Sequence, residues 1–133
     1  MTYQLQIVTP DGMRYDGQAV RLIIPTIDGQ VGILARHINY VTALGMGQAK
    51  VVTEAGERWA ACIGGMLAVT NGDVKVVATT FEWADEIDVE RARASLARGE
   101  AMLADPNKDE HTIQYANARI KRARVRLSAA EKR

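Results

Sequence analysis

Hydrophobic and polar residues alternate in short runs over the first 80 residues, which is the pattern of half-buried β-strands. Near the N-terminus, Tyr3, Leu5 and Ile7 are separated by single glutamines. Further apolar runs follow at close spacing, over residues 20–24, 31–34, 50–53, 58–61, 66–70 and 74–79. Many short strands at this spacing predict a β-sandwich or a barrel.

Turn signals between the runs indicate how neighbouring strands connect. Asn71 and Gly72 lie between two apolar runs, and Asn-Gly in that position is the strongest short signal for a β-hairpin. Residues 54–57 form a second hairpin signal. Gly64 and Gly65 interrupt an apolar stretch, where a glycine pair more often marks a bulge or a tight crossing than a binding loop.

The hydrophobic period changes after about residue 84, where alanine becomes frequent. Asp88 is a candidate helix cap, and Pro106 lies where the helix that follows should end. A second helix is predicted from about residue 110 to residue 131. Apolar positions recur every three or four residues in both helices, at 89, 92, 96, 99 and 103, and at 113, 116, 120, 123, 127 and 130. Two such helices with a short connection predict an antiparallel hairpin.

These patterns together predict an α+β protein with a β domain, a sandwich or a barrel, over residues 1–84 and a helical hairpin domain over residues 85–133. About half of the apolar positions of the hairpin are alanine or glycine, so its own core contributes little stabilisation. A piece of this size with so thin a core must pack on the β domain, a partner or a ligand. An element that is stable in more than one packing is suited to a switch.

Composition narrows the class of protein. The chain has 133 residues, enough for one compact domain with an appendage, and no apolar run long enough to cross a membrane. The N-terminal residues lack the layout of a signal peptide. The single cysteine, Cys62, lies in an apolar run without a basic neighbour, which predicts a structural thiol in a reducing compartment.

Charge is distributed unevenly along the predicted hairpin. Residues 85–110 carry eight acidic and four basic side chains, whereas residues 111–133 carry one acidic and seven basic ones. Spacings of three, four and seven place several arginines of the second helix on one face, and two arginines of the first helix lie seven apart. These residues are Arg119, Arg122, Arg126 and Arg133, and Arg91 and Arg98. Converging guanidinium groups repel one another, so an anionic ligand or an acidic partner is the expected reason for them.

From the residues alone, three functions remain open for the arginines: binding a nucleotide through its phosphates, docking on an acidic protein surface, or binding nucleic acid nonspecifically. The last is the weakest, because the basic stretch has few aromatic residues and lies beside an acidic helix. The ordinary alternative is that these arginines form a solvent-exposed helix face and bind no ligand or partner. No catalytic residues are predicted, since no acid/base pair or nucleophile arrangement is visible. His37 and His111 have no metal-ligand spacing, so no metal site is predicted.

Several motifs follow one another along the whole chain, at residues 7–12 (IVTPDG), 28–34 (DGQVGIL) with His37 and Ile38, 64–69 (GGMLAV) and 127–131 (LSAAE). In their order and spacing they resemble the epsilon subunit of the bacterial F-type ATP synthase. The start of the first helix, Ile87-Asp88-x-x-Arg91-Ala92, resembles the motif of the members that bind nucleotide.

The resemblance implies a ten-stranded β-sandwich followed by a two-helix hairpin. It implies a non-catalytic rotor subunit of the central stalk that couples ring rotation to the catalytic head in proton-driven ATP synthesis. The implied partners are the gamma subunit and the c-ring, with the alpha and beta subunits when the hairpin extends and blocks ATP hydrolysis; nucleic acid is not among them. The implied location is peripheral, on the cytoplasmic face of the bacterial cell membrane.

The resemblance also implies that no cofactor is required and that ATP is a possible regulatory ligand, which holds the hairpin in its folded, non-inhibitory state. Carried over by motif, the candidate ATP-binding residues are Glu82, Ile87, Asp88, Arg91, Ala92, Arg98, Arg122 and Arg126. The four arginines would face the phosphates and the other residues would lie toward the base. Arg119 and Arg133 lack a match and are expected to be solvated or to face a partner. The alternative function is a free-standing nucleotide-sensing or nucleic-acid-binding module.

Overall fold

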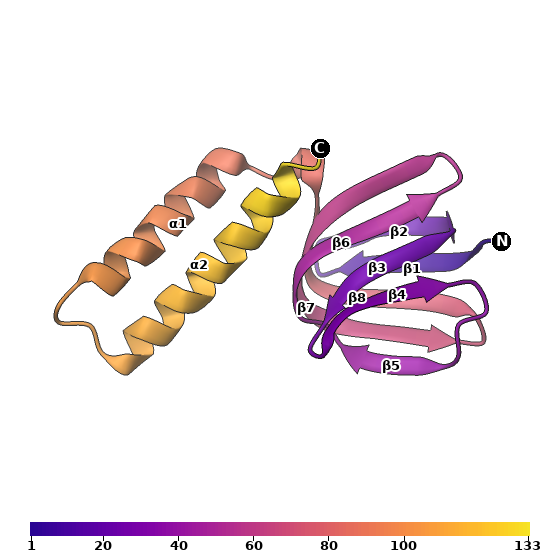
Figure 1. The fold of residues 1–133 in the computed structure, drawn as a ribbon, viewed down its shortest axis with the longest axis horizontal. Coiled ribbons are helices and arrows are strands. Elements are labelled where there is room, and N and C mark those ends of the chain that lie inside the picture. Colours follow the sequence, from indigo (N-terminus) through magenta and orange to yellow (C-terminus); the bar gives the residue numbers. More distant parts are fainter.

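The computed structural model describes residues 1–133 and has two parts, a β-sandwich and a helical hairpin that projects from one end of it (Figure 1). The expected α+β fold, a sandwich followed by a two-helix hairpin, is confirmed. The eight strands are β1 (Tyr3–Thr9), β2 (Gly12–Ala19), β3 (Arg21–Thr26), β4 (Gly29–Leu34), β5 (Tyr40–Ala43), β6 (Met46–Thr53), β7 (Gly56–Thr70) and β8 (Asp73–Trp83).

Two long strands, β7 and β8, connect the halves of the sandwich. The first half of β7 pairs with β6 and its second half pairs with β5, while the first half of β8 pairs in parallel with β1. The change of partner occurs at Gly64 and Gly65, both of which have positive φ. A Cβ on Gly65 would lie 2.1 Å from the carbonyl oxygen of Val77, so only glycine allows this approach. The predicted bulge or crossing is confirmed.

The strand count is eight rather than the ten that the resemblance implies, and the two long strands explain the difference. Strands β7 and β8 run unbroken through both halves of the sandwich. Each is therefore one continuous strand in the place of two shorter strands. Strands β2 and β5 were not predicted individually. Every residue of β2 except Ala19 is at least partly exposed, and β5 is only four residues long, so neither has a clear apolar alternation.

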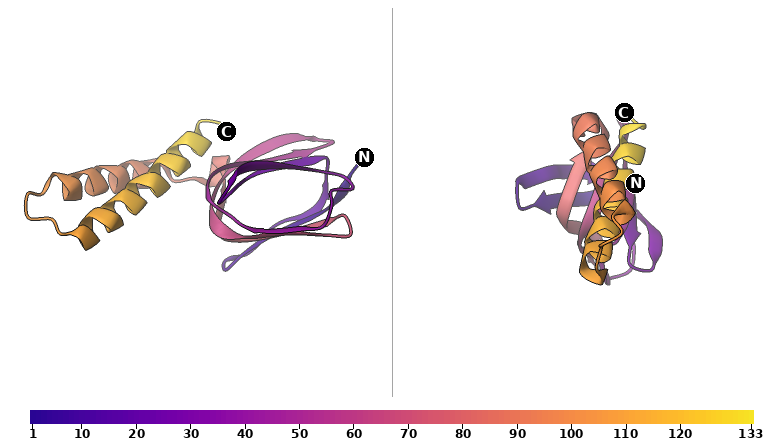
Figure 2. Two further views of the ribbon diagram at one scale, coloured as in Figure 1. Left: turned by 60° about the horizontal axis from the view of Figure 1, so that its bottom comes forward. Right: turned by 90° about the vertical axis from the view of Figure 1, so that its left-hand side faces the viewer.

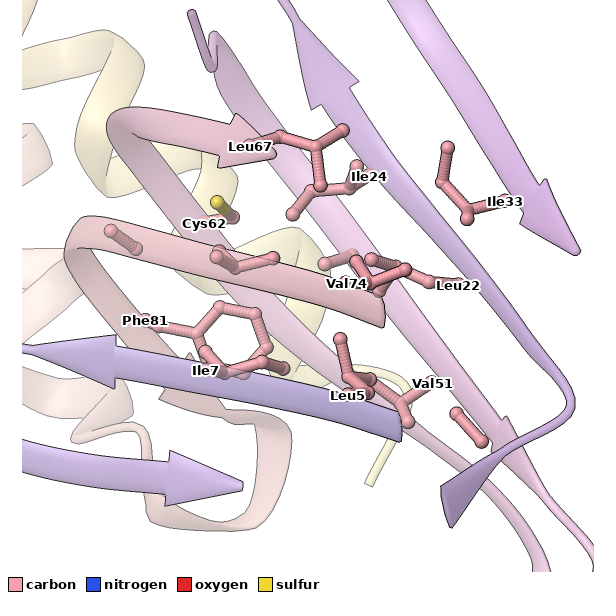
Figure 3. Close-up of a cluster of buried hydrophobic side chains, with 14 of the residues drawn as sticks. Leu5, Ile7, Leu22, Ile24, Ile33, Val51, Cys62, Leu67, Val74 and Phe81 are labelled. Atoms are coloured by element: carbon pink, nitrogen blue, oxygen red, sulfur yellow. The ribbon is translucent and has the colours of Figure 1, made fainter. Parts of the chain in front are cut away.

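The core fills the space between the two halves of the sandwich with mainly aliphatic side chains, which surround the ring of Phe81 (Figure 3). Phe81 and Trp83 pack edge to face with ring centroids 5.1 Å apart. The thiol of Cys62 is fully buried, and burial raises its pKa to about 12. Because thiolate is the reactive form, Cys62 is the unreactive structural cysteine that the sequence predicts.

The hairpin consists of α1 (Val89–Ala104) and α2 (Glu110–Ala130), which follow a short 3₁₀ turn, η1 (Ala84–Glu86). Asp88 caps α1 by accepting a hydrogen bond from the Arg91 amide at 3.0 Å, and Asp109 caps α2 through the Thr112 amide at 2.7 Å. That bond to the charged carboxylate lowers the pKa of Asp109. The predicted cap, Asp88, is confirmed, and the predicted helix limits agree with the structure to within one or two residues. No helix is long and apolar enough to cross a membrane.

Only the C-terminal half of α2 rests on the sandwich, and the tip of the hairpin extends away from it (Figure 2). A small apolar cluster forms this joint, in which Ala129 and Ala130 pack against Ala61 of β7 and Ile87. On one side of the joint, Gln48 of β6 donates a hydrogen bond to the Ser128 hydroxyl. The hairpin therefore depends on a limited contact with the β domain, in keeping with its thin core.

Candidate functional site: an arginine-lined cleft

A cleft of about 590 Å³ lies between the two helices where they leave the sandwich. Its lining comes from the end of β8, from η1 and from facing surfaces of both helices. The lining residues are Glu82, Glu86, Asp88, Arg91, Ala92, Ala94, Ser95, Arg98, Arg119, Arg122 and Arg126. The structure thus brings together seven of the eight candidate residues, which lie in segments up to 44 positions apart in the sequence.

The acidic residues of the cleft lie near the sandwich and already have partners. The Arg126 Nε donates to Glu82 Oε1 at 2.5 Å, across the joint between α2 and β8. Glu86 lies 3.7 Å from the Arg14 guanidinium of β2, and one oxygen of Asp88 accepts the helix-capping bond. Most of the negative charge at this end is therefore balanced locally.

The arginines of the cleft outnumber its carboxylates, five against three. Arg91 and Arg98 are exposed on α1, and Arg122 is partly buried on α2. Of the five, only Arg126 forms an ion pair with an acidic side chain. A concave surface with unpaired guanidinium groups attracts an anion, and the planar guanidinium geometry matches phosphate oxygens.

Ile87 is the candidate residue that does not line the cleft. Its side chain is 5 % exposed and packs in the apolar joint with Ala129 and Ala130. The carbonyl oxygen of Ile87 accepts a hydrogen bond from Arg133 Nη2 at 3.3 Å. In this conformation Ile87 positions the start of α1. Arg133 connects the C-terminus of the hairpin to Ile87, so it is not only a solvated charge.

Arg119 lies in the cleft, although it has no match in the nucleotide-binding motif. Its Nη1 donates to the Tyr115 hydroxyl at 3.1 Å, and its Nε is buried without a hydrogen-bond partner. The spacing of three and four residues already placed Arg119 on one helical face with Arg122 and Arg126, and the absent motif match led to the expectation that it is solvated or faces a partner.

A second groove of about 530 Å³ lies between α2 and β6. Gln48, Lys121, Arg124 and Ser128 line it, with Asn117 and apolar residues. None of the candidate residues lies there. Arg124 therefore provides a basic residue of the same helix that lies outside the arginine-lined cleft.

The cleft has the chemistry of a binding site. No group of three or more His, Cys, Asp or Glu side chains is placed to hold a metal ion. The carboxylates that are present support the fold through a cap and ion pairs. The arginines, which are five different side chains on two separate helices, are suited to bridging those helices through one anionic ligand.

Family models match almost the whole chain. The model for the ATP synthase delta/epsilon chain β-sandwich domain matches residues 2–84, and the model for the long α-helix domain of the same chains matches residues 85–131. ATP synthase epsilon chains from bacteria are similar over nearly their full length. The chain is 35% identical to that of Shouchella clausii, covering 98% of this chain and 96% of the relative.

Two further epsilon chains show the same level of similarity. That of Gloeobacter violaceus is 37% identical, with 98% of both chains covered, and that of Staphylococcus aureus is 39% identical, with 98% and 97% covered. Among solved structures, a chain of the Euglena gracilis mitochondrial ATP synthase superposes with a TM-score of 0.81 at 25% identity, covering 96% of this chain and 79% of that one. A chain of the Tetrahymena thermophila mitochondrial ATP synthase central stalk and c-ring has the same fold, with a TM-score of 0.66 at 13% identity and 96% and 95% coverage.

Proposed function

The chain belongs to the ATP synthase delta/epsilon family, and from this premise we propose that its hairpin regulates a rotary ATP synthase in response to ATP. Epsilon chains are non-catalytic subunits of the central stalk. In the proposal, the β-sandwich contacts the gamma subunit and the c-ring, and the chain rotates with them during proton-driven ATP synthesis. The complex is membrane-bound and this subunit is peripheral to it, in our proposal on the cytoplasmic face.

The observation that carries the regulatory part of the proposal is the arginine-lined cleft between α1 and α2. A nucleoside triphosphate held there would contact both helices, and through Glu82 and Arg126 the ligand site adjoins the joint with the sandwich. The chemistry supports phosphate contacts by Arg91, Arg98, Arg122 and Arg126. Asp88 and Ala92 lie near the sandwich end, where the base would fit.

A ligand that binds only the docked hairpin stabilises that state by RT ln(1 + [L]/Kd). This contribution is about 2.7 kcal/mol when the ligand is at a hundredfold excess over Kd. It shifts an equilibrium between two hairpin positions by about a hundredfold, provided that the other position does not bind ATP. The joint is small, so an effect of this size is sufficient to decide whether the hairpin stays docked.

The released hairpin has a second use in the proposal. Residues 111–133 carry seven basic side chains and one acidic one, so an extended α2 would be attracted to acidic surfaces of the alpha and beta subunits. A helix docked there would resist rotation and inhibit ATP hydrolysis. The same arginines would then serve ATP in one conformation and protein carboxylates in the other.

Co-purification tests the stalk assignment. A tagged chain expressed in its own cells is expected to recover the gamma, alpha and beta subunits in one complex, whose hydrolysis rate rises when this chain is removed. Recovery of the chain alone would support a free-standing module instead, which the full-length similarity to epsilon chains does not favour. A complex with a hydrolysis rate that is independent of this chain would refute the inhibitory role.

A further inference from the structure

Four of the five arginines of the cleft lie at matching levels on the two antiparallel helices. Gly99 of α1 fixes the register, because a Cβ there would lie 2.6 Å from Ile120 Cγ1 and 3.3 Å from the Ala116 carbonyl oxygen. Gly99 therefore faces the turn between Ala116 and Ile120. In an antiparallel pair, each step forward along α1 corresponds to a step back along α2.

This register assigns a facing position to each polar residue of the cleft. Arg98, one residue before Gly99, lies at the level of Arg119. Arg91, seven residues earlier, lies at the level of Arg126, which is seven residues further along α2. Seven residues of helix correspond to about 10 Å along the axis. The cleft thus has two levels of paired arginines, one near the sandwich and one nearer the hairpin tip.

Ser95 and Arg122 lie at an intermediate level between the two arginine pairs. Both line the cleft and both are partly buried. A serine hydroxyl and a guanidinium group both donate hydrogen bonds to phosphate oxygens. Hydrogen-bond donors are therefore present at both arginine levels and at the level between them.

The guanidinium group of Arg119 is oriented to bind an anion in the cleft. Its Nε is buried and has no acceptor within the protein, which leaves one N–H of the guanidinium group unsatisfied. Its Nη1 is held by the hydroxyl of Tyr115, one turn earlier on α2. The Tyr115 contact orients the guanidinium plane and leaves other N–H groups of Arg119 free to donate.

We infer that Arg98 and Arg119 form a distal phosphate-binding pair, which contacts the terminal phosphate of a nucleoside triphosphate whose other phosphates lie between Arg91, Arg122 and Arg126. Tyr115 is a positioning residue for Arg119. This inference rests on the proposed ATP site, which already includes Arg98, and extends that site by Arg119. It makes the distal pair the part of the cleft that distinguishes a triphosphate from a diphosphate.

Titration calorimetry of the full chain with ATP and with ADP tests the inference. Arg119→Ala is expected to weaken ATP binding by about tenfold to a hundredfold, since one charge-assisted contact is lost, and to change ADP binding by less than about twofold. Arg119→Lys should recover only part of the ATP affinity, because an ammonium group cannot donate two parallel bonds. Tyr115→Phe should give a smaller loss that is again confined to ATP.

Arg124→Ala is the matched control, because it removes the same charge from α2 but outside the cleft. Both variants should retain the helical circular dichroism of the unmodified chain, and Arg119→Gln provides a second substitution if the alanine variant does not. Unchanged ATP affinity in Arg119→Ala overturns the inference and leaves the proposed site intact if Arg122→Ala still weakens binding. An equal loss for ATP and ADP also overturns it, since that result indicates a structural role. An unmodified chain that binds neither nucleotide removes the proposed site and the distal pair together.

Discussion

The Nε of Arg126 donates to Oε1 of Glu82 at 2.5 Å, and this ion pair connects α2 of the hairpin to the end of β8 in the sandwich. Each side chain is 30% exposed, so the pair is only partly screened by water. Arg126 also lines the arginine-lined cleft. One side chain thus belongs to both the cleft and the joint, so an anion bound in the cleft as we propose would act directly on the contact that holds the hairpin.

Arg122→Ala and Arg126→Ala are expected to lower the ATP affinity of the isolated subunit, with each lost contact weakening binding by roughly 1.5–3 kcal/mol. Arg126→Ala should also destabilise the joint, because it leaves Glu82 without its partner. Calorimetry measures the ATP affinity, and thermal unfolding measures the stability of the joint. Equal ATP affinity in the double variant and the unmodified chain would contradict the site assignment.

Gly99→Leu is expected to separate the two helices, because a side chain at this position meets Ile120 and the Ala116 carbonyl at sub-contact distances. Overpacking of this kind typically costs about 1–3 kcal/mol. Glu100→Leu is the control, since it introduces the same residue at the next position, which is exposed. Denaturant unfolding that is monitored by helical circular dichroism distinguishes them. Equal stability of the two variants would show that the close helix approach at Gly99 is absent in solution.

Lys132→Ala is expected to loosen the C-terminus of α2, because the Lys132 ammonium group lies 5.1 Å from the Trp59 ring centroid on β7. A partly exposed cation–π contact contributes about 0.5–1 kcal/mol. The expected result is a several-fold faster amide exchange in the last turn of α2. Glu131→Ala, at an exposed neighbouring position, should leave exchange unchanged. The same exchange rate in Lys132→Ala as in the unmodified chain would show that this contact does not stabilise the joint.

Deletion of residues 88–133 is expected to relieve inhibition of ATP hydrolysis and to leave assembly intact. The main sandwich core is built from residues of β1 to β8, so it does not require the hairpin. Hydrolysis rates and subunit composition of the purified complex provide the measurement. If the complex assembles with the shortened chain and hydrolyses ATP no faster, the hairpin is not inhibitory in this protein.

The helical hairpin was predictable from the sequence almost to the residue, because its signals are local. Asp88 and Pro106 mark the limits of α1, and the three- and four-residue spacing gives the facing surfaces. The strongest hairpin signal of the sandwich, Asn71-Gly72, also corresponds to an observed turn between β7 and β8. Local turn and cap chemistry determines these elements.

The sequence was less informative where a feature depends on contacts between distant segments. Strand β5 is short and pairs with β7 more than twenty residues away, so no local pattern marks it. The candidate site came from a motif, and motif matching placed Ile87 in it although that side chain packs in the joint. It also omitted Arg119, which lies in the cleft at the level of Arg98 because of the register that Gly99 sets between the helices. Register is a tertiary property that residue spacing on one helix does not contain.

Whether ATP stabilises the docked hairpin is tested by an ATP titration of the isolated subunit with a readout of hairpin position. Cysteines introduced at Ala55, in the turn after β6, and at Asn107, at the hairpin tip, can carry a fluorophore pair. The native Cys62, with a pKa of about 12 in the sandwich core, should not be labelled. Energy transfer should report an ATP-dependent, saturable rise in the docked population of the unmodified chain and no rise in the Arg122→Ala/Arg126→Ala variant. A hairpin position that is independent of ATP in the unmodified chain would show that ATP does not stabilise the docked hairpin.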